Sequence, residues 1–167
     1  LSSELSRIKG IELFNDLRTS EKRLKWITDK KTDLEGLTSN IVSKFSKALR
    51  KAFRDKDFVP EFLKNPLIFI CKNEGLFNKR MSELVTKINK NALKLSERDK
   101  QKSLNALSDD SINDYINEYK ELLESENKFK QKDFSLLRKA EAFERRLMEL
   151  NSKIKHDIKD IDTFRER

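Results

Sequence analysis

A run of cationic side chains in the first third of the chain is the feature best suited to chemistry. Six Lys and Arg residues fall within thirteen positions, and Asp55 is the only acidic residue among them. Ammonium and guanidinium groups bind carboxylates and phosphates, so this run predicts recognition of an acidic partner. Steps of three and four residues place several of the cations on one face of a helix. The candidate partner-binding residues are Lys44, Lys47, Arg50, Lys51, Arg54 and Lys56.

The same segment has a second interpretation, as an amphipathic helix whose polar face is only solvated. Its apolar face consists of Phe45, Ala48, Leu49, Ala52 and Phe53. Most cationic helix faces keep a helix in solution and bind nothing specific. Nucleic-acid binding would need exposed aromatic side chains for base stacking, or a recognisable module, and the segment has neither. We therefore expect nucleic acid to be a less suitable partner than an acidic protein.

The rest of the chain is poor in catalytic residue types. It has one histidine, His156, one cysteine, Cys71, and three glycines, too few for a metal site, a catalytic triad or a phosphate loop. We expect no catalytic, metal-binding or cofactor-binding residues, and no enzyme. Trp26 lies one position off the apolar stripe of its helix, which predicts packing at the margin of the core. An exposed Trp26 would instead be a candidate hot spot for a partner.

The elements that hold these residues are predicted to be helices throughout. Glycine and proline together account for five residues, and 40% of the chain is charged. Apolar residues recur at steps of three and four along most of the chain, which is the period of a buried helical stripe. We expect an all-α fold, an antiparallel bundle of about six or seven helices that forms one domain over residues 1–167.

Turn and cap residues predict where these helices begin and end. Gly36 is the expected end of the first helix, and Asn65 with Pro66 predicts the start of a short helix over 66–71. That segment is apolar on all sides, so we expect a fully buried element enclosed by the long terminal helices. A buried strand is the alternative interpretation, but no second strand is available to pair with it. Gly75 is expected to close the short helix in a left-handed conformation.

Further caps are expected in the second half of the chain. Ser96 and Asp99 resemble a capping box, residues 108–111 provide the next cap, and Asp133 is expected to cap the last helix. Both ends of the chain, including residues 165–167, are expected to fray. The last helix carries an apolar seam that suits a bundle or a coiled coil. The seam consists of Leu136, Leu137, Ala140, Phe143, Leu147, Leu150, Ile154, Ile158 and Ile161.

Four segments, at residues 14–18, 25–27, 69–73 and 76–80, lie in a helical chain rich in Lys, Asn, Ser and Phe. In these segments the chain resembles small plasmid-encoded helical surface or exported proteins of Borrelia. The nearest resemblance is to the exported plasmid protein A and BapA group, and a more distant one is to the OspE/F-like leader-peptide lipoproteins. The resemblance implies a non-enzymatic helical protein that binds a host macromolecule through its surface, with a role in immune evasion.

These observations lead to one expected function and two alternatives. We expect a bacterial surface or exported protein that binds a host protein, with its leader outside this chain, while a cytoplasmic location stays open. The alternatives are an intracellular helical adaptor that uses the seam of the last helix, and a nucleic-acid-binding protein that uses residues 44–56. The chain is expected to be a monomer or a dimer. Its longest apolar stretch is far shorter than the roughly 20 residues that span a bilayer, so no transmembrane segment is expected.

Overall fold

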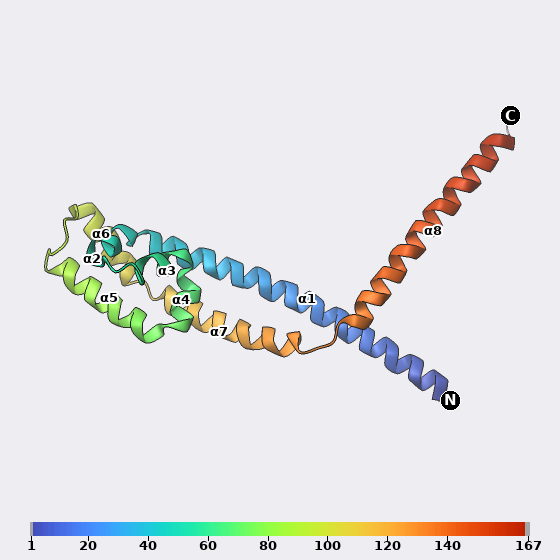
Figure 1. Cartoon of the computed structure of the whole chain (residues 1–167), viewed down its shortest axis with the longest axis horizontal. Coiled ribbons are helices and arrows are strands. Elements are labelled where there is room, and N and C mark those ends of the chain that lie inside the picture. The colour runs from blue at the N-terminus through green and yellow to red at the C-terminus, as the bar shows by residue number, and fades with distance from the viewer. Residues whose placement is uncertain (1, 166–167) are drawn as a thin grey trace. The chain divides into compact units, whose positions relative to one another are not determined.

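Every regular element that the computed structural model describes is a helix, over residues 2–165 with side chains from residue 3 (Figure 1). The all-α prediction is therefore confirmed, with eight helices rather than six or seven. Residues 1, 166 and 167, part of the ends predicted to fray, lie outside the described residues. The helices are α1 (Ser2–Ser43), α2 (Ser46–Ala52), α3 (Val59–Lys64), α4 (Pro66–Lys72), α5 (Glu74–Asn89), α6 (Glu97–Leu107), α7 (Ser111–Lys130) and α8 (Ser135–Arg165).

The contacts of the chain group into two compact units. Residues 25–127 form the first, here called the central unit, and the described residues of 1–24 and 128–167 form the second, here called the terminal unit. Both α1 and α7 contribute residues to each unit. The expectation of one domain over 1–167 stays a prediction. In the part of the chain that the structure covers, no helix has the length and apolar character to cross a bilayer.

Aromatic rings form the centre of the central unit. The ring centroids of neighbouring phenylalanines lie 5.6 to 5.7 Å apart, in stacked or edge-on arrangements. Such pairs add to the free energy gained from burying the rings themselves. This cluster joins the C-terminal end of α2 to α3, α4 and α5. Its members are Phe53, Phe58, Phe62, Phe69 and Phe77.

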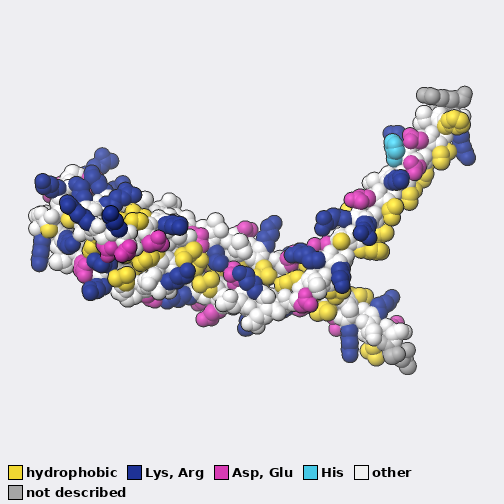
Figure 2. All heavy atoms as spheres, viewed as in Figure 1, with side chains coloured by type: hydrophobic (Ala, Val, Ile, Leu, Met, Phe, Trp, Pro, Cys, Tyr) yellow, Lys and Arg dark blue, Asp and Glu magenta, His cyan; other side chains and the backbone are white. Residues whose placement is uncertain are grey.

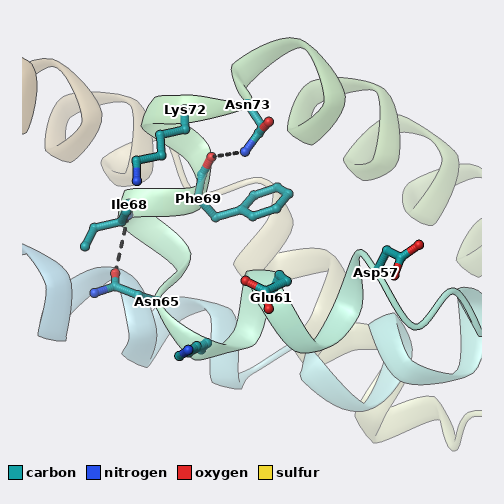
Figure 3. Close-up of a pocket in the computed structure, with 8 residues that line it drawn as sticks. Asp57, Glu61, Asn65, Ile68, Phe69, Lys72 and Asn73 are labelled. Carbon is teal, nitrogen blue, oxygen red and sulfur yellow. Dashed lines mark hydrogen bonds between the residues drawn. The ribbon is translucent and has the colours of Figure 1, made fainter.

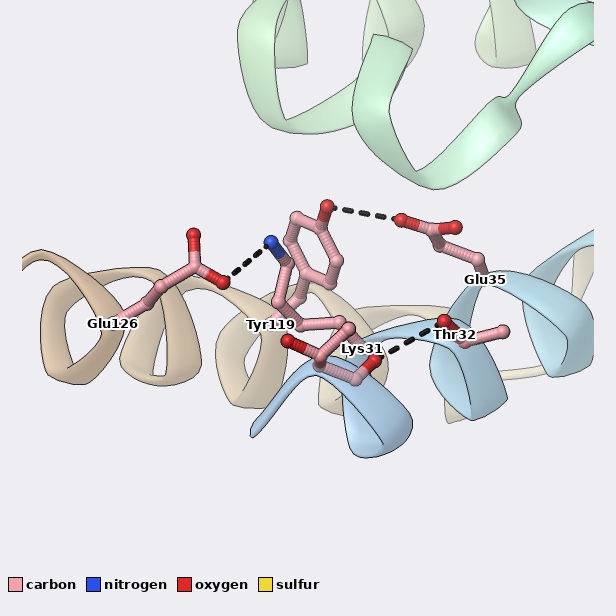
Figure 4. Close-up of polar contacts among 6 residues, drawn as sticks. Lys31, Thr32, Glu35, Tyr119 and Glu126 are labelled. Atoms are coloured by element: carbon pink, nitrogen blue, oxygen red, sulfur yellow. Dashed lines mark hydrogen bonds and ion pairs between the residues drawn. The ribbon is translucent and has the colours of Figure 1, made fainter. Parts of the chain in front are cut away.

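Polar contacts align α1 with α7 inside the central unit (Figure 4). Lys31 Nζ lies 3.0 Å from Glu126 Oε2, and the Tyr119 hydroxyl donates to Glu35 Oε1 at 3.1 Å. Because Lys31 precedes Glu35 whereas Glu126 follows Tyr119, the two helices run antiparallel here. The Lys31 ammonium also lies 5.6 Å from the centre of the Tyr119 ring. Burial, and then the hydrogen bond to Glu35, raise the pKa of Tyr119 well above its ordinary value.

The short apolar helix α4 forms as predicted but is not fully buried. Asn65 Oδ1 accepts a hydrogen bond from the Ile68 amide at 3.3 Å, and Pro66 is the first helical residue, so the predicted cap is confirmed. Leu67 and Ile70 are buried, whereas Ile68 and Phe69 are only half-buried. They line a surface hollow of about 560 Å³ between α3 and α4 (Figure 3).

The prediction of a fully buried α4 is therefore wrong, and the reason is geometric. Consecutive apolar residues on a two-turn helix point in all directions, and neighbouring elements cover the directions of Leu67 and Ile70. The side of α4 that faces the hollow stays accessible to solvent. Helices α3 and α5 pack against α4, and enclosure by the long terminal helices stays a prediction.

Two glycines expected to end helices lie inside them. Gly36 is in α1, which continues to Ser43, and Gly75 is in the first turn of α5. No described glycine has a positive φ, so neither takes the left-handed conformation of a helix end. Leu34 and Thr38 are buried on either side of Gly36, and their packing outweighs the weak helix preference of glycine. Both predicted glycine caps were therefore wrong, and α4 ends at Lys72 with Asn73 as its C-cap.

Three caps in the second half of the chain match the sequence. Ser96 Oγ accepts from the Asp99 amide at 3.1 Å, confirming the start of α6. The carboxylates of Asp109 and Asp133 each accept a backbone amide at 2.9 Å, from Ser111 and Ser135 respectively. These two bonds confirm the predicted starts of α7 and α8.

Within the terminal unit, α8 contacts α1 through its beginning and the loop before it. Lys132 Nζ donates to Asp16 Oδ2 and to Ser20 Oγ, each at 2.9 Å, and Arg138 pairs with Glu21. Leu137 is the one buried side chain among the described residues of α8. Apart from Leu137 and the half-buried Ala140, the members of the apolar seam predicted for this helix are exposed.

Candidate functional site

The sequence predicted a helix that aligns several of the six candidate cations on one face, and only three of the six lie in one helix. Lys47, Arg50 and Lys51 lie in α2, which ends at Ala52, whereas Lys44 precedes α2 in a turn. Arg54 and Lys56 lie in the irregular segment that follows. The helix ends because Phe53 adopts an extended backbone, and its ring packs edge-on against Phe58 in the core.

The end of α2 brings three of these cations to one surface hollow. Arg50, Lys51 and Arg54 line a hollow of about 430 Å³ together with Ala92, Leu93 and Lys94. We call this surface, defined by Arg50, Lys51, Arg54 and Lys94, the basic hollow. The Lys51 ammonium donates to the main-chain oxygen of Lys94, which ties α2 to the loop between α5 and α6. Figure 2 shows Lys and Arg side chains gathered near α2 and α6.

The chemistry of the basic hollow suits a carboxylate-rich partner. None of the described residues that line it is acidic, so its four positive charges are not neutralised within the hollow. Each guanidinium group of Arg50 and Arg54 can hold a carboxylate with two parallel hydrogen bonds. Ala92 and Leu93 provide an apolar wall, against which the aliphatic part of a partner side chain can pack.

Neighbouring residues hold the end of α2 in place. The Lys87 ammonium donates to the Ala52 oxygen at 2.9 Å and lies 4.7 Å from the centre of the Phe53 ring. Arg80 stacks over the same ring at 5.0 Å. A cation at the C-terminal end of a helix also stabilises its dipole. The position of Arg54, one residue beyond Phe53, is therefore fixed by the core.

The other three candidates lie apart from the hollow. Lys47 Nζ is 2.6 Å from Asp99 Oδ2, and this hydrogen bond is the main cause that lowers the pKa of Asp99. Lys44 is exposed, and its charge contributes to the lowered pKa of Asp109, after the hydrogen bonds from Ser111. Lys56 is exposed in the turn before α3 and does not line the hollow.

Sequence reasoning missed Lys94, the fourth cation of the hollow. It lies 43 residues from Lys51 and in an irregular loop, so no helical spacing connects the two. The loop begins where Asn91 adopts a φ of 54°, the one positive φ among the described non-glycine residues. Asparagine tolerates this conformation well, so Asn91 was a usable sign of a chain reversal, although not of its direction.

The remaining candidate residues form no reactive site. His156 is exposed, with Nε2 at 3.4 Å from Asp160 Oδ2. Cys71 is half-buried, and burial is the main cause that raises the pKa of its thiol. The described residues contain no group of three or more His, Cys, Asp or Glu side chains able to hold a metal ion. Trp26 is 46% exposed, so the expectation that it packs in the core is wrong.

The chain matches no known protein family, and neither a curated protein nor a solved structure is significantly similar to it.

Proposed function

We propose that this chain is a non-enzymatic binding protein that recognises an acidic protein surface through the basic hollow. In the setting that the resemblance implies, it is a bacterial surface or exported protein and the partner is a host protein. The observation that carries the proposal is the hollow itself, where four cations from two separate segments meet and none of the described lining residues is acidic. In this proposal the central unit is an antiparallel helical bundle that serves as the scaffold of the hollow.

Charge and shape both support an acidic protein as the partner. The net charge of +8 attracts acidic surfaces over distances of about one Debye length, which accelerates encounter. The arginine forks favour carboxylates, and the apolar wall of Ala92 and Leu93 favours a partner that presents aliphatic groups beside its acids. Carboxylates and aliphatic groups lie side by side on protein surfaces, so a protein is the partner that this combination favours.

A pull-down from serum at physiological salt tests this proposal. The wild-type chain is expected to retain a specific protein. The Arg50→Glu/Arg54→Glu variant is expected to retain at least about tenfold less of it, since each clustered charge contact contributes about 1 kcal/mol or more to binding. The matched control is Lys25→Glu/Lys79→Glu, which changes the net charge equally at two exposed positions outside the hollow. Equal retention by all three chains, or no retained protein at all, would reject the proposal.

Nucleic-acid binding is the alternative to recognition of an acidic protein. In the same experiment, a labelled DNA duplex replaces serum, and its affinity for the wild-type chain is measured at low and physiological salt. We expect the wild-type chain to bind DNA weakly. The affinity should fall with salt to the same extent in Arg50→Glu/Arg54→Glu, the hollow variant, and in Lys25→Glu/Lys79→Glu, the control variant. A steep salt dependence that only the hollow variant loses would instead identify phosphates as the natural ligand.

A further inference from the structure

One face of α8 carries a long exposed apolar stripe. Figure 2 shows hydrophobic side chains in an unbroken row along this helix. Seven large members of the stripe are between 41% and 63% exposed. They are Leu136, Phe143, Leu147, Leu150, Ile154, Ile158 and Ile161. Exposed contiguous apolar surface of this extent marks an interaction site.

We propose that the stripe binds the same stripe of a second copy of this chain, with the two α8 helices antiparallel. The stripe is roughly 38 Å long at about 1.5 Å per residue. It therefore covers between three and four heptads, the length at which a two-helix seam becomes a stable coiled coil. This proposal is independent of the basic hollow, which lies in the central unit.

The order of side chains along the stripe favours the antiparallel orientation. If Leu147 of one copy packs against Leu150 of the other, Phe143 faces Ile154 and Leu136 faces Ile161. The small Ala140 then faces residue 157, beside Ile158, which leaves room for the Ile158 side chain in that layer. A parallel pair would place Phe143 against Phe143 and Ala140 against Ala140, giving one crowded and one empty layer.

The charges beside the stripe favour the same orientation. Along one flank the charges change from positive, at Lys139, Arg146 and Lys153, to negative, at Asp157 and Asp160. A flank whose two ends have opposite charges complements its own reversal, because Lys139 then lies opposite Asp160 of the second copy.

The second flank has the opposite pattern, with Glu144 followed by Lys155. Reversal places Glu144 opposite Lys155 of the second copy. One unfavourable contact, between Arg146 and Lys153 near the centre, is outnumbered by these attractive pairs. A parallel pair would also bring the two Asp157 side chains together beside the seam, which is repulsive.

Sedimentation equilibrium of the full chain tests the existence of the dimer. We expect the wild-type chain to form dimers at micromolar concentration and Leu147→Glu to be a monomer, because the substitution places a charge at the centre of the seam. The matched control is Met148→Glu, at an adjacent position that is 70% exposed and off the stripe. This variant should dimerise as the wild-type chain does. A monomeric wild-type chain, or a dimer that Leu147→Glu leaves intact, would overturn the proposal.

Charge reversal tests the orientation. Lys139→Glu and Asp160→Lys should each weaken the dimer roughly tenfold, since each places like charges together at two symmetric positions. The double variant Lys139→Glu/Asp160→Lys should recover the wild-type affinity, because the two positions are too far apart on one helix to interact within a single copy. A parallel dimer has no such pairing, so failure of the double variant to recover would contradict the antiparallel arrangement.

A distance measurement completes the test. Spin labels at residue 163 of a Cys71→Ser/Thr163→Cys chain should be roughly 40 Å apart in the antiparallel dimer, since each lies about 14 residues from the centre of the pair. Labels that lie within about 20 Å of each other would show a parallel pair and overturn the proposal.

Discussion

Tyr119 shows how single residues hold α1 and α7 together. Its side chain is buried, and its hydroxyl reaches Glu35 on the opposite helix while its ring lies beneath the Lys31 ammonium. One aromatic residue therefore provides packing, a hydrogen bond and a cation–π contact at the same place. The polar contacts come from α1, 84 residues away, and no local pattern encodes them.

Removal of the Tyr119 hydroxyl is expected to destabilise the central unit modestly. Tyr119→Phe keeps the ring and loses the bond to Glu35, and because Glu35 is half-exposed, water can replace the lost donor. We expect a loss of about 1 kcal/mol in the free energy of unfolding, measured by urea denaturation. The matched control is Tyr115→Phe, one turn away and half-buried, which should change stability by less than half as much. Equal losses in both variants would show that the bond to Glu35 contributes nothing.

The Asp133 cap makes the stability of the start of α8 depend on pH. The amide and hydroxyl of Ser135 donate to its carboxylate and lower its pKa from the ordinary value of 3.8. A carboxylate whose folded-state pKa is lowered stabilises the fold above the unfolded-state value, and this contribution is lost as the pH falls through the folded-state value.

The consequence can be measured by circular dichroism between pH 5 and pH 2. Asp133→Asn keeps an oxygen acceptor for the cap but cannot titrate. We expect the wild-type chain to be the more stable of the two at pH 5, and the difference to shrink as the pH falls below about 4. A difference in melting temperature that is constant over this range would contradict the role of the Asp133 charge.

At the scale of elements, local chemistry predicted where helices start better than where they end. The starts of α4, α6, α7 and α8 have side-chain caps that are visible in the sequence at Asn65, Ser96, Asp109 and Asp133. The predicted helix ends failed because they relied on glycine, whose conformation depends on the packing of its neighbours. For the same reason α2 ended early, since burial of the Phe53 ring outweighs the helical spacing of the cations.

Because α1 is continuous through Gly36, an alanine at this position is expected to stabilise the chain. A Cβ atom at this position would meet no other atom within 4 Å, and the backbone is helical. Gly36→Ala should therefore raise the free energy of unfolding by about 0.5 to 1 kcal/mol, measured by urea denaturation. The expected cause is the smaller backbone entropy of alanine in the unfolded chain. A destabilised Gly36→Ala variant would mean that α1 is interrupted at this residue.

At the scale of the whole molecule, the two proposals place one binding surface in each unit, the basic hollow in the central unit and the α8 stripe in the terminal unit. The hollow could be predicted in part, because the cations of residues 50–54 are adjacent in sequence, but its loop residue Lys94 could not. The stripe was visible as a seam, yet periodicity alone does not tell whether a seam faces its own core or a second chain. The exposure of most of its members shows that the stripe does not face the core of its own chain.

A dimer through α8 would present two basic hollows, so the two proposals combine into a prediction about avidity. Leu147→Glu is expected to leave the affinity for a soluble acidic partner unchanged, because it does not touch the hollow. On a surface that carries many copies of the partner, the same variant should dissociate at least tenfold faster than the wild-type chain, since only the dimer can bind twice. Surface plasmon resonance at low and high partner density measures both quantities, with Met148→Glu as the control. Equal dissociation at high density would show that the dimer does not contribute to binding.

The central claim is that the cations of the basic hollow recognise acidic groups, and the affinity of the retained partner at two salt concentrations tests it most directly. The account predicts a dissociation constant that is at least tenfold larger for Arg50→Glu/Arg54→Glu than for Lys25→Glu/Lys79→Glu at physiological salt. It also predicts that this gap narrows at high salt, where the charges are screened. An affinity that is the same for both variants at every salt concentration would contradict the account.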